Sequence, residues 1–482
     1  MKDFLEKINN VIENGKYKDS WESLHQYEVP KWYRNARFGI FIHWGVYSVP
    51  AFGSEWYSRN MYIRGSREYK HHIETYGLHK DFGYKDFVPM FKAEKFDPAD
   101  WAELFKNAGA EYVMPVAEHH DGFQMYDSSL SEWNAKQKGP HRDILGELFK
   151  EFDKKGLIGC ASSHRVEHWF FMGHGREFES DVKGEMKRGD FYWPAMPERD
   201  HYDFNSEPPP SKEYLEDWLC RCCEIVDKYR PKMIYFDWWI QHSAVKPYLK
   251  RFAAYYYNTV EGAVINYKHD AFKFGTAVID IERGQFSEAK PFIWQSDTAV
   301  AINSWCYTKN NKYKKPYAIV RDLVDIVSKN GRLLLNIGPK ADGTIPDEDR
   351  EILMAIGDWL RVNGEAIYGA KVWKRSSEGP AIMIDGGFAD AEEKVFTNED
   401  FRFTAKGPAL YAICMNMKGK NKALIRSLAS REPGKDAFYS DNIGSVTQLG
   451  SNDAVNWSRT EEGLLITTKQ IETEMPVVFK IC

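Results

Sequence analysis

The sequence has no long run of apolar residues. Nowhere does it approach the stretch of about 18 apolar residues that a membrane-spanning helix needs. Its opening segment, MKDFLEKINNVIENGKYKDSW, carries charges throughout and lacks the apolar core of a secretory signal. We therefore expect no membrane partner and, for a chain that starts at Met1, a cytoplasmic location.

The sequence also lacks paired cysteines. Its seven cysteines are an odd number without the spacing of a disulfide framework, so we expect reduced thiols. Cys220, Cys222 and Cys223 fall in a predicted helix, and no second Cys or His pair follows at the spacing of zinc ligands. A structural metal is therefore not expected there.

Neither sign of charge is in large excess. The 482 residues include 65 basic and 70 acidic side chains, a formal net charge of -5, so a nucleic-acid partner is not expected. Aromatic residues are abundant, by contrast, at 15% of the chain with 16 Trp and 27 Tyr. Their flat faces suit either a carbohydrate site or an aromatic-rich core, and composition leaves both interpretations open.

Short apolar runs alternate with amphipathic segments, which is the pattern of parallel strands joined by helices. The runs predict seven strands, at residues 38–42, 112–116, 158–161, 233–236, 263–265, 292–294 and 333–337. Apolar residues at three- and four-residue intervals predict helices at residues 98–108, 143–154, 212–229, 245–257, 317–329 and 346–363. One weaker strand would complete the eight of a (β/α)8 barrel.

The pattern changes after about residue 370. Short alternating runs at residues 409–415, 422–425, 463–468 and 477–481 are separated by Gly, Asp, Asn and Ser, which is typical of an antiparallel β-sandwich. The predicted fold class is therefore α/β, a (β/α)8-like barrel followed by a C-terminal antiparallel β-sandwich. We place a helical extension at residues 1–30, the barrel at residues 31–368 and the sandwich at residues 369–482.

Polar and aromatic residues follow six of the predicted strands, where the reactive side chains of such barrels gather. The segments are His43-Trp44-Gly45, Glu118-His119-His120-Asp121-Gly122, Ser162-Ser163-His164, Asp237-Trp238-Trp239, Asn266-Tyr267-Lys268 and, after Trp294, Gln295-Ser296-Asp297. A single histidine at a strand end is often structural, but the whole set favours a site at one face. The candidates for substrate binding are His43, His119, His120, His164, Trp239, Lys268 and Trp294.

Asp237 is the strongest catalytic candidate. The segment MIYFDWW places it directly after a buried run and beside large aromatic rings, where burial and neighbouring donors tune its pKa. An aspartate that caps the next helix is the alternative. Glycoside hydrolysis needs a second carboxyl group, about 5 to 5.5 Å away in a retaining enzyme. The downstream candidates are Asp280, Glu282, Glu288 and Asp297. We favour Glu282, expected on a loop beside Arg283.

The histidines also allow a metal site. His119, His120 and Asp121, with the distant His43, are residues of the kind that bind zinc. Adjacent residues of a strand point to opposite faces, so only one histidine of the pair would face the pocket unless the strand has already ended. Imidazoles that bind sugar hydroxyls are the better interpretation, and we expect no metal and no cofactor.

Five blocks of the sequence, in the correct order, resemble the α-L-fucosidases of glycoside hydrolase family 29. They are WYRNARFGIFIHWGVYSVPAFGSEWYSRNMY, AEHHDGFQMYDSS, MIYFDWW, VSKNGRLLLNIGPKADGTIP and WLRVNGEAIYG. The resemblance implies a (β/α)8-like catalytic domain with a C-terminal β-sandwich. It also implies a retaining exo-α-L-fucosidase that acts on fucosylated oligosaccharides or glycoconjugates by double displacement.

The resemblance also assigns roles by position. Asp237 is similar to the family's nucleophile, and Glu282 is assigned as acid/base by its spacing from Asp237. The positions similar to the family's fucose-binding residues are His43, Glu55, Trp56, His119 and His120.

The chain departs from the family pattern at three positions. Glu118 stands where the family often has Lys, Gln295 where it often has Glu, and Lys268 near an Arg that often binds the sugar. These departures keep two alternatives open, a related α-L-glycosidase that accepts L-galactose and a non-catalytic carbohydrate-binding barrel. A metal-dependent hydrolase built on the histidines is a third. A homo-oligomer is left open as well.

Overall fold

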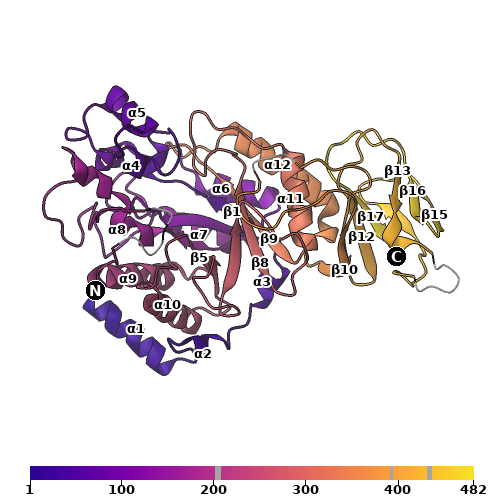
Figure 1. Cartoon of the computed structure of the whole chain (residues 1–482), viewed down its shortest axis with the longest axis horizontal. Helices are drawn as coiled ribbons and strands as arrows, with labels where there is room; N and C mark the ends of the chain where they lie inside the picture. Colours follow the sequence, from indigo (N-terminus) through magenta and orange to yellow (C-terminus); the bar gives the residue numbers. More distant parts are fainter. Residues whose placement is uncertain (201–202, 204–207, 391–393, 431–436) are drawn as a thin grey trace.

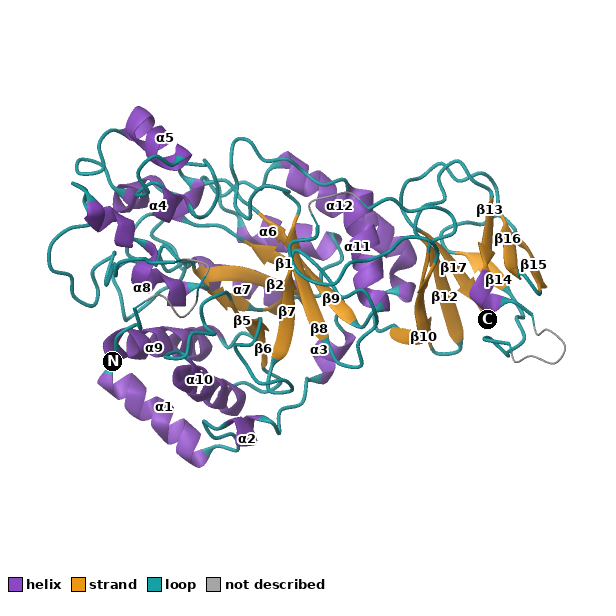
Figure 2. Cartoon of the chain, in the orientation of Figure 1, coloured by secondary structure: helices purple, strands orange, loops and turns teal. Residues whose placement is uncertain are grey.

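The computed structural model describes residues 1–200, 203, 208–390, 394–430 and 437–482. Its larger part is a barrel of parallel strands surrounded by helices, and the chain ends in antiparallel strands beyond α11 and α12 (Figures 1 and 2). The predicted fold class is thus confirmed.

Nine strands form the barrel sheet within the described residues, in the order β1-β9-β8-β7-β6-β5-β4-β2-β3, and the pairing of β1 with β2 closes it. Their bounds are β1 (Phe38–Ile42), β2 (Tyr112–Glu118), β3 (Ile158–Gly159), β4 (Ala161–Ser163), β5 (Met233–Phe236), β6 (Val264–Lys268), β7 (Val278–Glu282), β8 (Trp294–Ala299) and β9 (Gly331–Ile337). Both β3 and β4 pair with β2, so the two short strands occupy one position of the barrel.

Two barrel strands differ from the prediction. The weak eighth strand is β7, whose sequence VIDIE alternates apolar and acidic residues, so Glu282 ends a strand instead of lying on a loop. The strand predicted at residues 292–294 is β8, which begins at Trp294 and continues through Gln295 and Asp297. These polar side chains are buried inside the barrel and hydrogen-bonded, so the strand does not stop where the apolar run stops.

Helices surround the barrel strands and also lie in the connections between them (Figure 2). Their bounds are α1 (Lys2–Asn14), α2 (Trp21–Leu24), α3 (Lys31–Asn35), α4 (Tyr57–Asn60), α5 (Arg67–Tyr76), α6 (Pro98–Asn107), α7 (Ile144–Lys155), α8 (His168–Phe171), α9 (Lys212–Tyr229), α10 (Lys246–Thr259), α11 (Pro316–Ser328) and α12 (Asp347–Asn363). Asp97, Asp143 and Ser211 each cap a predicted helix by accepting a hydrogen bond from a backbone N–H of its first turn. A search of the described helices found none with the length and apolar character needed to cross a membrane.

The described residues of the C-terminal part form two antiparallel sheets. One has the order β10-β11-β12-β17-β14, formed by β10 (Lys371–Glu378), β11 (Phe401–Lys406), β12 (Ala409–Cys414), β17 (Val477–Ile481) and β14 (Val446–Gln448). The other is formed by β13 (Lys422–Ile425), β16 (Gly463–Thr467) and β15 (Asn456–Thr460). The four strands predicted here are β12, β13, β16 and β17.

A buried ion pair joins this part to the barrel. Arg402 of β11 donates to Asp325 of α11, and both side chains are almost inaccessible to solvent. The Trp359 indole of α12 donates to the Pro476 carbonyl at 2.8 Å. The two parts therefore pack as one body along α11 and α12.

Candidate active site

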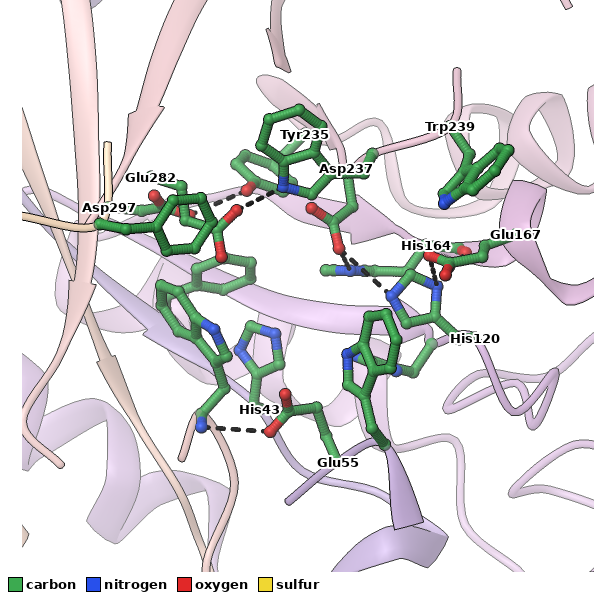
Figure 3. Close-up of a pocket in the computed structure, with 16 residues that line it drawn as sticks. His43, Glu55, His120, His164, Glu167, Tyr235, Asp237, Trp239, Glu282 and Asp297 are labelled. Atoms are coloured by element: carbon green, nitrogen blue, oxygen red, sulfur yellow. Dashed lines mark hydrogen bonds and ion pairs between the residues drawn. The ribbon is translucent and has the colours of Figure 1, made fainter. Parts of the chain in front are cut away.

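A cavity of about 490 Å³ opens at the C-terminal ends of the barrel strands. Ten of the candidate residues named from the sequence line it, namely His43, Glu55, Trp56, His119, His120, His164, Asp237, Trp239, Glu282 and Asp297. In Figure 3, Asp237 and Glu282 lie on one side of this space, and His43 and Glu55 lie on the facing side.

The ends of the strands bring these residues together. His43 follows β1, His164 follows β4 and Asp237 follows β5, so each side chain leaves the barrel at the same face. Because β2 ends at Glu118, His119 and His120 are no longer held to opposite faces, and both line the cavity.

Asp237 is held as a carboxylate. Its Oδ2 lies 2.9 Å from His164 Nδ1 and 3.3 Å from His120 Nε2. Burial by itself would raise the pKa of Asp237, but His164 and His120 outweigh that effect and hold the pKa well below its usual range. Asp237 is therefore an anion at the cavity wall, and contacts of its Oδ2 with two imidazoles orient the carboxylate group.

Glu167 keeps a positive charge on His120. Its Oε2 lies 3.2 Å from His120 Nδ1, and both side chains are buried. Burial alone would lower the pKa of His120, but Glu167 and Asp237 raise it by more, and the resulting pKa is about 9. His120 is thus an imidazolium at neutral pH that lies between two carboxylates, with one ring nitrogen facing each (Figure 3).

Glu282 differs from Asp237 in protonation. Burial, together with the negative charges of Asp297 and Asp237, raises its pKa to about 7, although Lys268 and the indole of Trp238 act in the opposite direction. Trp238 Nε1 donates to Glu282 Oε2 at 2.5 Å, and Lys268 Nζ lies 3.5 Å from the same oxygen. A carboxyl group with this pKa can hold a proton near neutral pH and can also release it.

The other acid candidates are placed less favourably. Asp280 and Asp297 accept hydrogen bonds from the buried Lys268 ammonium, at 2.6 and 3.1 Å. Asp297 lines the cavity, but its side chain is only 1% exposed, and burial raises its pKa well above the usual range. Glu288 is exposed and is not among the residues that line the cavity. Among these carboxyl groups, Glu282 is the one poised to exchange a proton with a ligand.

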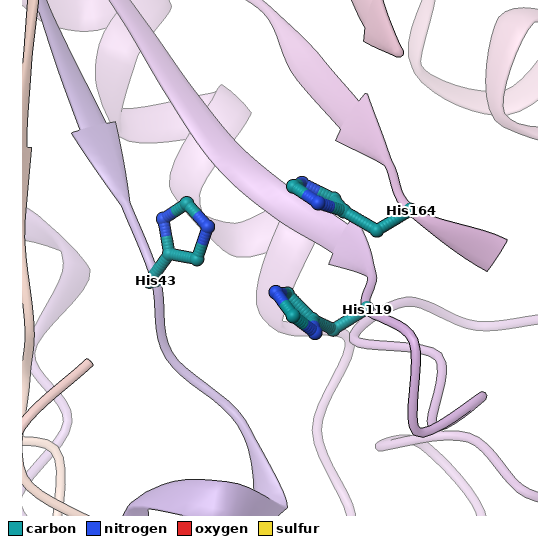
Figure 4. Close-up of side chains that lie close together, drawn as sticks. All are labelled: His43, His119 and His164. Atoms are coloured by element: carbon teal, nitrogen blue, oxygen red, sulfur yellow. The ribbon is translucent and has the colours of Figure 1, made fainter. Parts of the chain in front are cut away.

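Three histidines form a neutral group. His43, His119 and His164 come from the ends of β1, β2 and β4 and each has one ring nitrogen within 4.8 Å of the others (Figure 4). Burial lowers the pKa of all three, so each imidazole has one donor and one acceptor at neutral pH. The cluster differs from the set considered for the zinc alternative, which included His120, because both ring nitrogens of His120 lie beside carboxylates.

Two predicted substrate-binding residues do not line the cavity. Trp294 begins β8, so it lies at the other end of the barrel, where its buried indole donates to the Lys329 carbonyl at 3.0 Å. Lys268 is 1% exposed and lies among three carboxylates, those of Asp280, Asp297 and Glu282. It therefore sets the charge around Glu282 instead of offering a donor to the cavity.

Gln295 does not occupy the position of an acid in the cavity. Its side chain is fully buried in the barrel, donates to Asp280 Oδ1 at 2.8 Å and accepts hydrogen bonds from Tyr33 and Tyr112. The replacement that had suggested a non-catalytic barrel therefore leaves the two cavity carboxyl groups in place.

Several residues were missed by sequence reasoning. Those lining the cavity are Phe41, Glu167, Tyr235, Trp238, Trp305 and Phe388. Trp238 stood in the segment after β5, but of its two tryptophans only Trp239 was selected. Trp305 comes from the long connection between β8 and α11, where its backbone N–H donates to Glu55 at 3.1 Å. Phe388 comes from beyond the barrel, and no local pattern marks it.

The arrangement suits hydrolysis of a glycoside. One carboxyl group is anionic and the other gains and loses its proton near neutral pH, and both border one cavity with neutral imidazoles and aromatic rings. A nucleophile and a proton donor with separated pKa values are the pair that this chemistry uses.

Comparison with known proteins agrees with this geometry. A family model described as alpha-L-fucosidase matches residues 4–365. The tissue alpha-L-fucosidase of Rattus norvegicus is 31% identical over 463 residues, covering 94% of this chain and 89% of the rat protein. That of Homo sapiens is 30% identical over 478 residues, covering 97% of this chain and 91% of the human protein.

Solved structures give the same result. The crystal structure of Thermotoga maritima alpha-fucosidase superposes with a TM-score of 0.76 at 30% identity, covering 97% of this chain and all of the other. The structure of that protein in complex with a mechanism-based inhibitor gives a TM-score of 0.77 at 29% identity, covering 96% of this chain and 99% of the other. The similarity thus includes the barrel and the C-terminal sheets.

Proposed function

This chain is a glycoside hydrolase of the α-L-fucosidase family, glycoside hydrolase family 29, and on that premise we propose that it removes terminal α-L-fucosyl groups with retention of configuration. Asp237 is the proposed nucleophile and Glu282 the proposed acid/base. The observation that supports this most directly is the contrast between them, since the pKa of Asp237 lies well below its usual range and that of Glu282 is raised to about 7.

In the proposed first step, Asp237 Oδ attacks the anomeric carbon while Glu282 gives its proton to the leaving glycosidic oxygen. A covalent fucosyl-enzyme forms and the leaving group departs as an alcohol. In the second step Glu282, now a carboxylate, takes a proton from water, whose oxygen attacks the same carbon and releases Asp237. Two inversions return the α configuration.

The remaining residues are proposed to bind the sugar. Neutral imidazoles of His43, His119 and His164 each offer a donor and an acceptor, which suits the hydroxyl groups of a pyranose. Glu55 adds an acceptor and Trp56 a flat apolar face in the same wall. Trp239 is proposed to cover the C6 methyl group, whose burial is worth about 1 kcal/mol.

Replacement of the proposed nucleophile tests the mechanism. We expect Asp237→Gly to lower kcat for an aryl α-L-fucoside by at least about a thousandfold. Azide should partly restore turnover by entering on the side of the missing carboxylate and should give the β-fucosyl azide. Undiminished turnover, or an α-fucosyl azide, would refute the assignment. In the unmodified enzyme, NMR should detect the α anomer of fucose first.

A pair of matched variants tests the acid. Glu282→Gln should lower kcat/KM for a fucosyl disaccharide by about a hundredfold or more, because the leaving alkoxide then departs without a proton. Its effect on α-L-fucosyl fluoride should be small, since fluoride needs no such proton. Glu288→Gln removes an exposed carboxyl group outside the cavity and should leave kcat/KM for both substrates unchanged. The reverse result would assign the acid to Glu288.

The alternative with L-galactose is decided by the same assay run on an aryl α-L-galactoside, whose sugar differs by one hydroxyl group at C6. A higher kcat/KM for that substrate than for the fucoside would favour it. A cytoplasmic location and a homo-oligomer stay predictions of the sequence.

A further inference from the structure

A segment of the C-terminal part reaches the strand that ends at Glu282. Residues 385–390 follow β10 in the sequence, about a hundred residues after β7, yet their backbone pairs with the chain leaving β7. Phe388 N–H donates to the Glu282 carbonyl at 2.8 Å, and Ala389 N–H donates to the Arg283 carbonyl at 2.7 Å. Gly386 and Gln285 exchange both of their backbone hydrogen bonds, at 3.0 and 3.1 Å. The segment is therefore attached by backbone hydrogen bonds to the chain at the end of β7, next to the proposed acid.

Glycine residues on both sides allow this close approach. A Cβ atom at Gly284 would lie 1.9 Å from the Gly386 carbonyl oxygen, and one at Gly387 would lie 2.8 Å from the Glu282 carbonyl oxygen. Gly386 also has a φ of +116°, which side-chain-bearing residues rarely adopt. The contact thus depends on small residues at matching positions of the two segments.

Charged side chains fix the end of the segment. Asp390 accepts hydrogen bonds from Lys314 and Thr298, and its Oδ2 lies 3.5 Å from Arg283 Nη1. The positive charges of Lys314 and Arg283 outweigh burial and lower the pKa of the Asp390 carboxyl group. Both partners belong to the barrel side of the contact, so the segment is held by backbone pairing and by a buried carboxylate.

This attachment places Phe388 at the cavity. Its ring belongs to the cavity wall that also contains Glu282, while 63% of the residue is open to solvent. Its backbone has a φ of +57°, an uncommon conformation for a residue with a side chain. A ligand that occupies the Glu282 side of the cavity would contact this residue and remove apolar surface from water, which favours binding.

We propose that Phe388 binds the leaving group of the substrate, and that this group is a sugar ring. The inference rests on the proposed function, in which Glu282 protonates the glycosidic oxygen. The group attached to that oxygen must then lie on the side of Glu282, where the backbone contact holds Phe388. A pyranose has an apolar C–H face that packs on an aromatic ring, so the C-terminal part contributes a specificity-determining residue to the barrel active site.

The test compares two substrates that share the fucosyl group. In α-L-fucosyl fluoride the leaving group is a single atom that is too small to reach the Phe388 ring, whereas a fucosyl disaccharide presents a whole sugar. We expect Phe388→Ala to lower kcat/KM about tenfold for the disaccharide that the unmodified enzyme cleaves best. For the fluoride the change should stay within about twofold, which also shows that the variant folds.

Two further variants serve as controls. Phe388→Trp keeps a flat apolar ring and should retain most of the disaccharide activity. Ile384→Ala removes another exposed apolar side chain of the same connection, one that does not line the cavity. It should leave kcat/KM unchanged for both substrates. Free sugars corresponding to the leaving group should inhibit the unmodified enzyme more strongly than Phe388→Ala.

The outcomes separate this inference from the proposed function. An unmodified enzyme that cleaves neither substrate would contradict the proposed function. Two results would overturn the leaving-group role of Phe388 and leave the proposed cleavage of fucosyl groups standing. One is an unmodified enzyme that cleaves the fluoride but none of a panel of fucosyl disaccharides. The other is a Phe388→Ala variant whose kcat/KM changes equally for both substrates, or for neither.

Discussion

The hydrogen bond from Trp238 to Glu282 should set the alkaline limb of the pH profile. The indole Nε1 lies 2.5 Å from Glu282 Oε2 and its hydrogen bond stabilises the carboxylate form, so it opposes the effect of burial and holds the pKa of Glu282 down to about 7. Trp238→Phe keeps the ring but removes the donor. The protonated form then becomes relatively more stable, and the pKa of Glu282 rises.

The size of the shift follows from the strength of the bond. A hydrogen bond to a charged group is worth about 1.5 to 3 kcal/mol, and one pKa unit corresponds to about 1.4 kcal/mol. We take the lower end, because the Glu282 side chain is 12% exposed and Lys268 still lies 3.5 Å away. The pKa should therefore rise by about one unit. At pH 8 the protonated fraction would increase from about one tenth to about one half.

The assay is the pH dependence of kcat/KM for a fucosyl disaccharide, which reports the pKa values of the free enzyme. In the unmodified enzyme activity should fall as pH rises through about 7, and in Trp238→Phe the fall should occur about one unit higher. With α-L-fucosyl fluoride this limb should be absent from both enzymes, because the first step then needs no proton donor. A limb that stays in place, or moves to lower pH, would show that Trp238 does not control the acid.

Two further predictions concern other buried charges. Glu167→Gln removes the carboxylate that keeps the pKa of His120 at about 9; His120 then loses its proton more easily, the pKa of Asp237 rises, and the acid limb of kcat/KM should move to higher pH. An unchanged acid limb would contradict this coupling. Asp325→Asn leaves the buried Arg402 and Lys329 without their carboxylate and should lower the free energy of unfolding in urea by about 3 to 5 kcal/mol. Asp358→Asn, which breaks an exposed ion pair with Arg361, is the matched control and should change little; equal effects would contradict the reasoning.

Much of the site could be predicted because barrel strands are short and end abruptly. Where an apolar run stops at a strand end, the next polar residue lies at the active face, and this located His43, His164 and Asp237. The same rule failed at β8, because Asp297 and its neighbours are buried polar residues within the strand, and Trp294 was therefore placed at the wrong end. The local pattern of apolar and polar residues does not show whether a strand ends at the first polar residue or continues with polar side chains that are hydrogen-bonded inside the barrel.

The remaining misses depend on contacts between distant segments. The pKa of Glu282 is set by burial and by contacts from three other parts of the chain, since Asp297 raises it while Lys268 and Trp238 lower it. Phe388 reaches the cavity through backbone hydrogen bonds to residues about a hundred positions earlier. Neither can be predicted from periodicity or from a motif. Both result from contacts between segments far apart in the sequence, and the sequence around each residue does not reveal which distant segment it contacts.

The attachment of residues 385–390 to the chain after β7 matters for engineering. A shortened protein that ends after α12 would keep the histidines and Asp237 but would expose the backbone of Glu282 and Arg283 to water. Grafting the corresponding connection from a relative would exchange one wall of the cavity while the histidines and Asp237 stayed in place. If Phe388 binds the leaving group as proposed, libraries that vary this connection alone should alter the preference for that group.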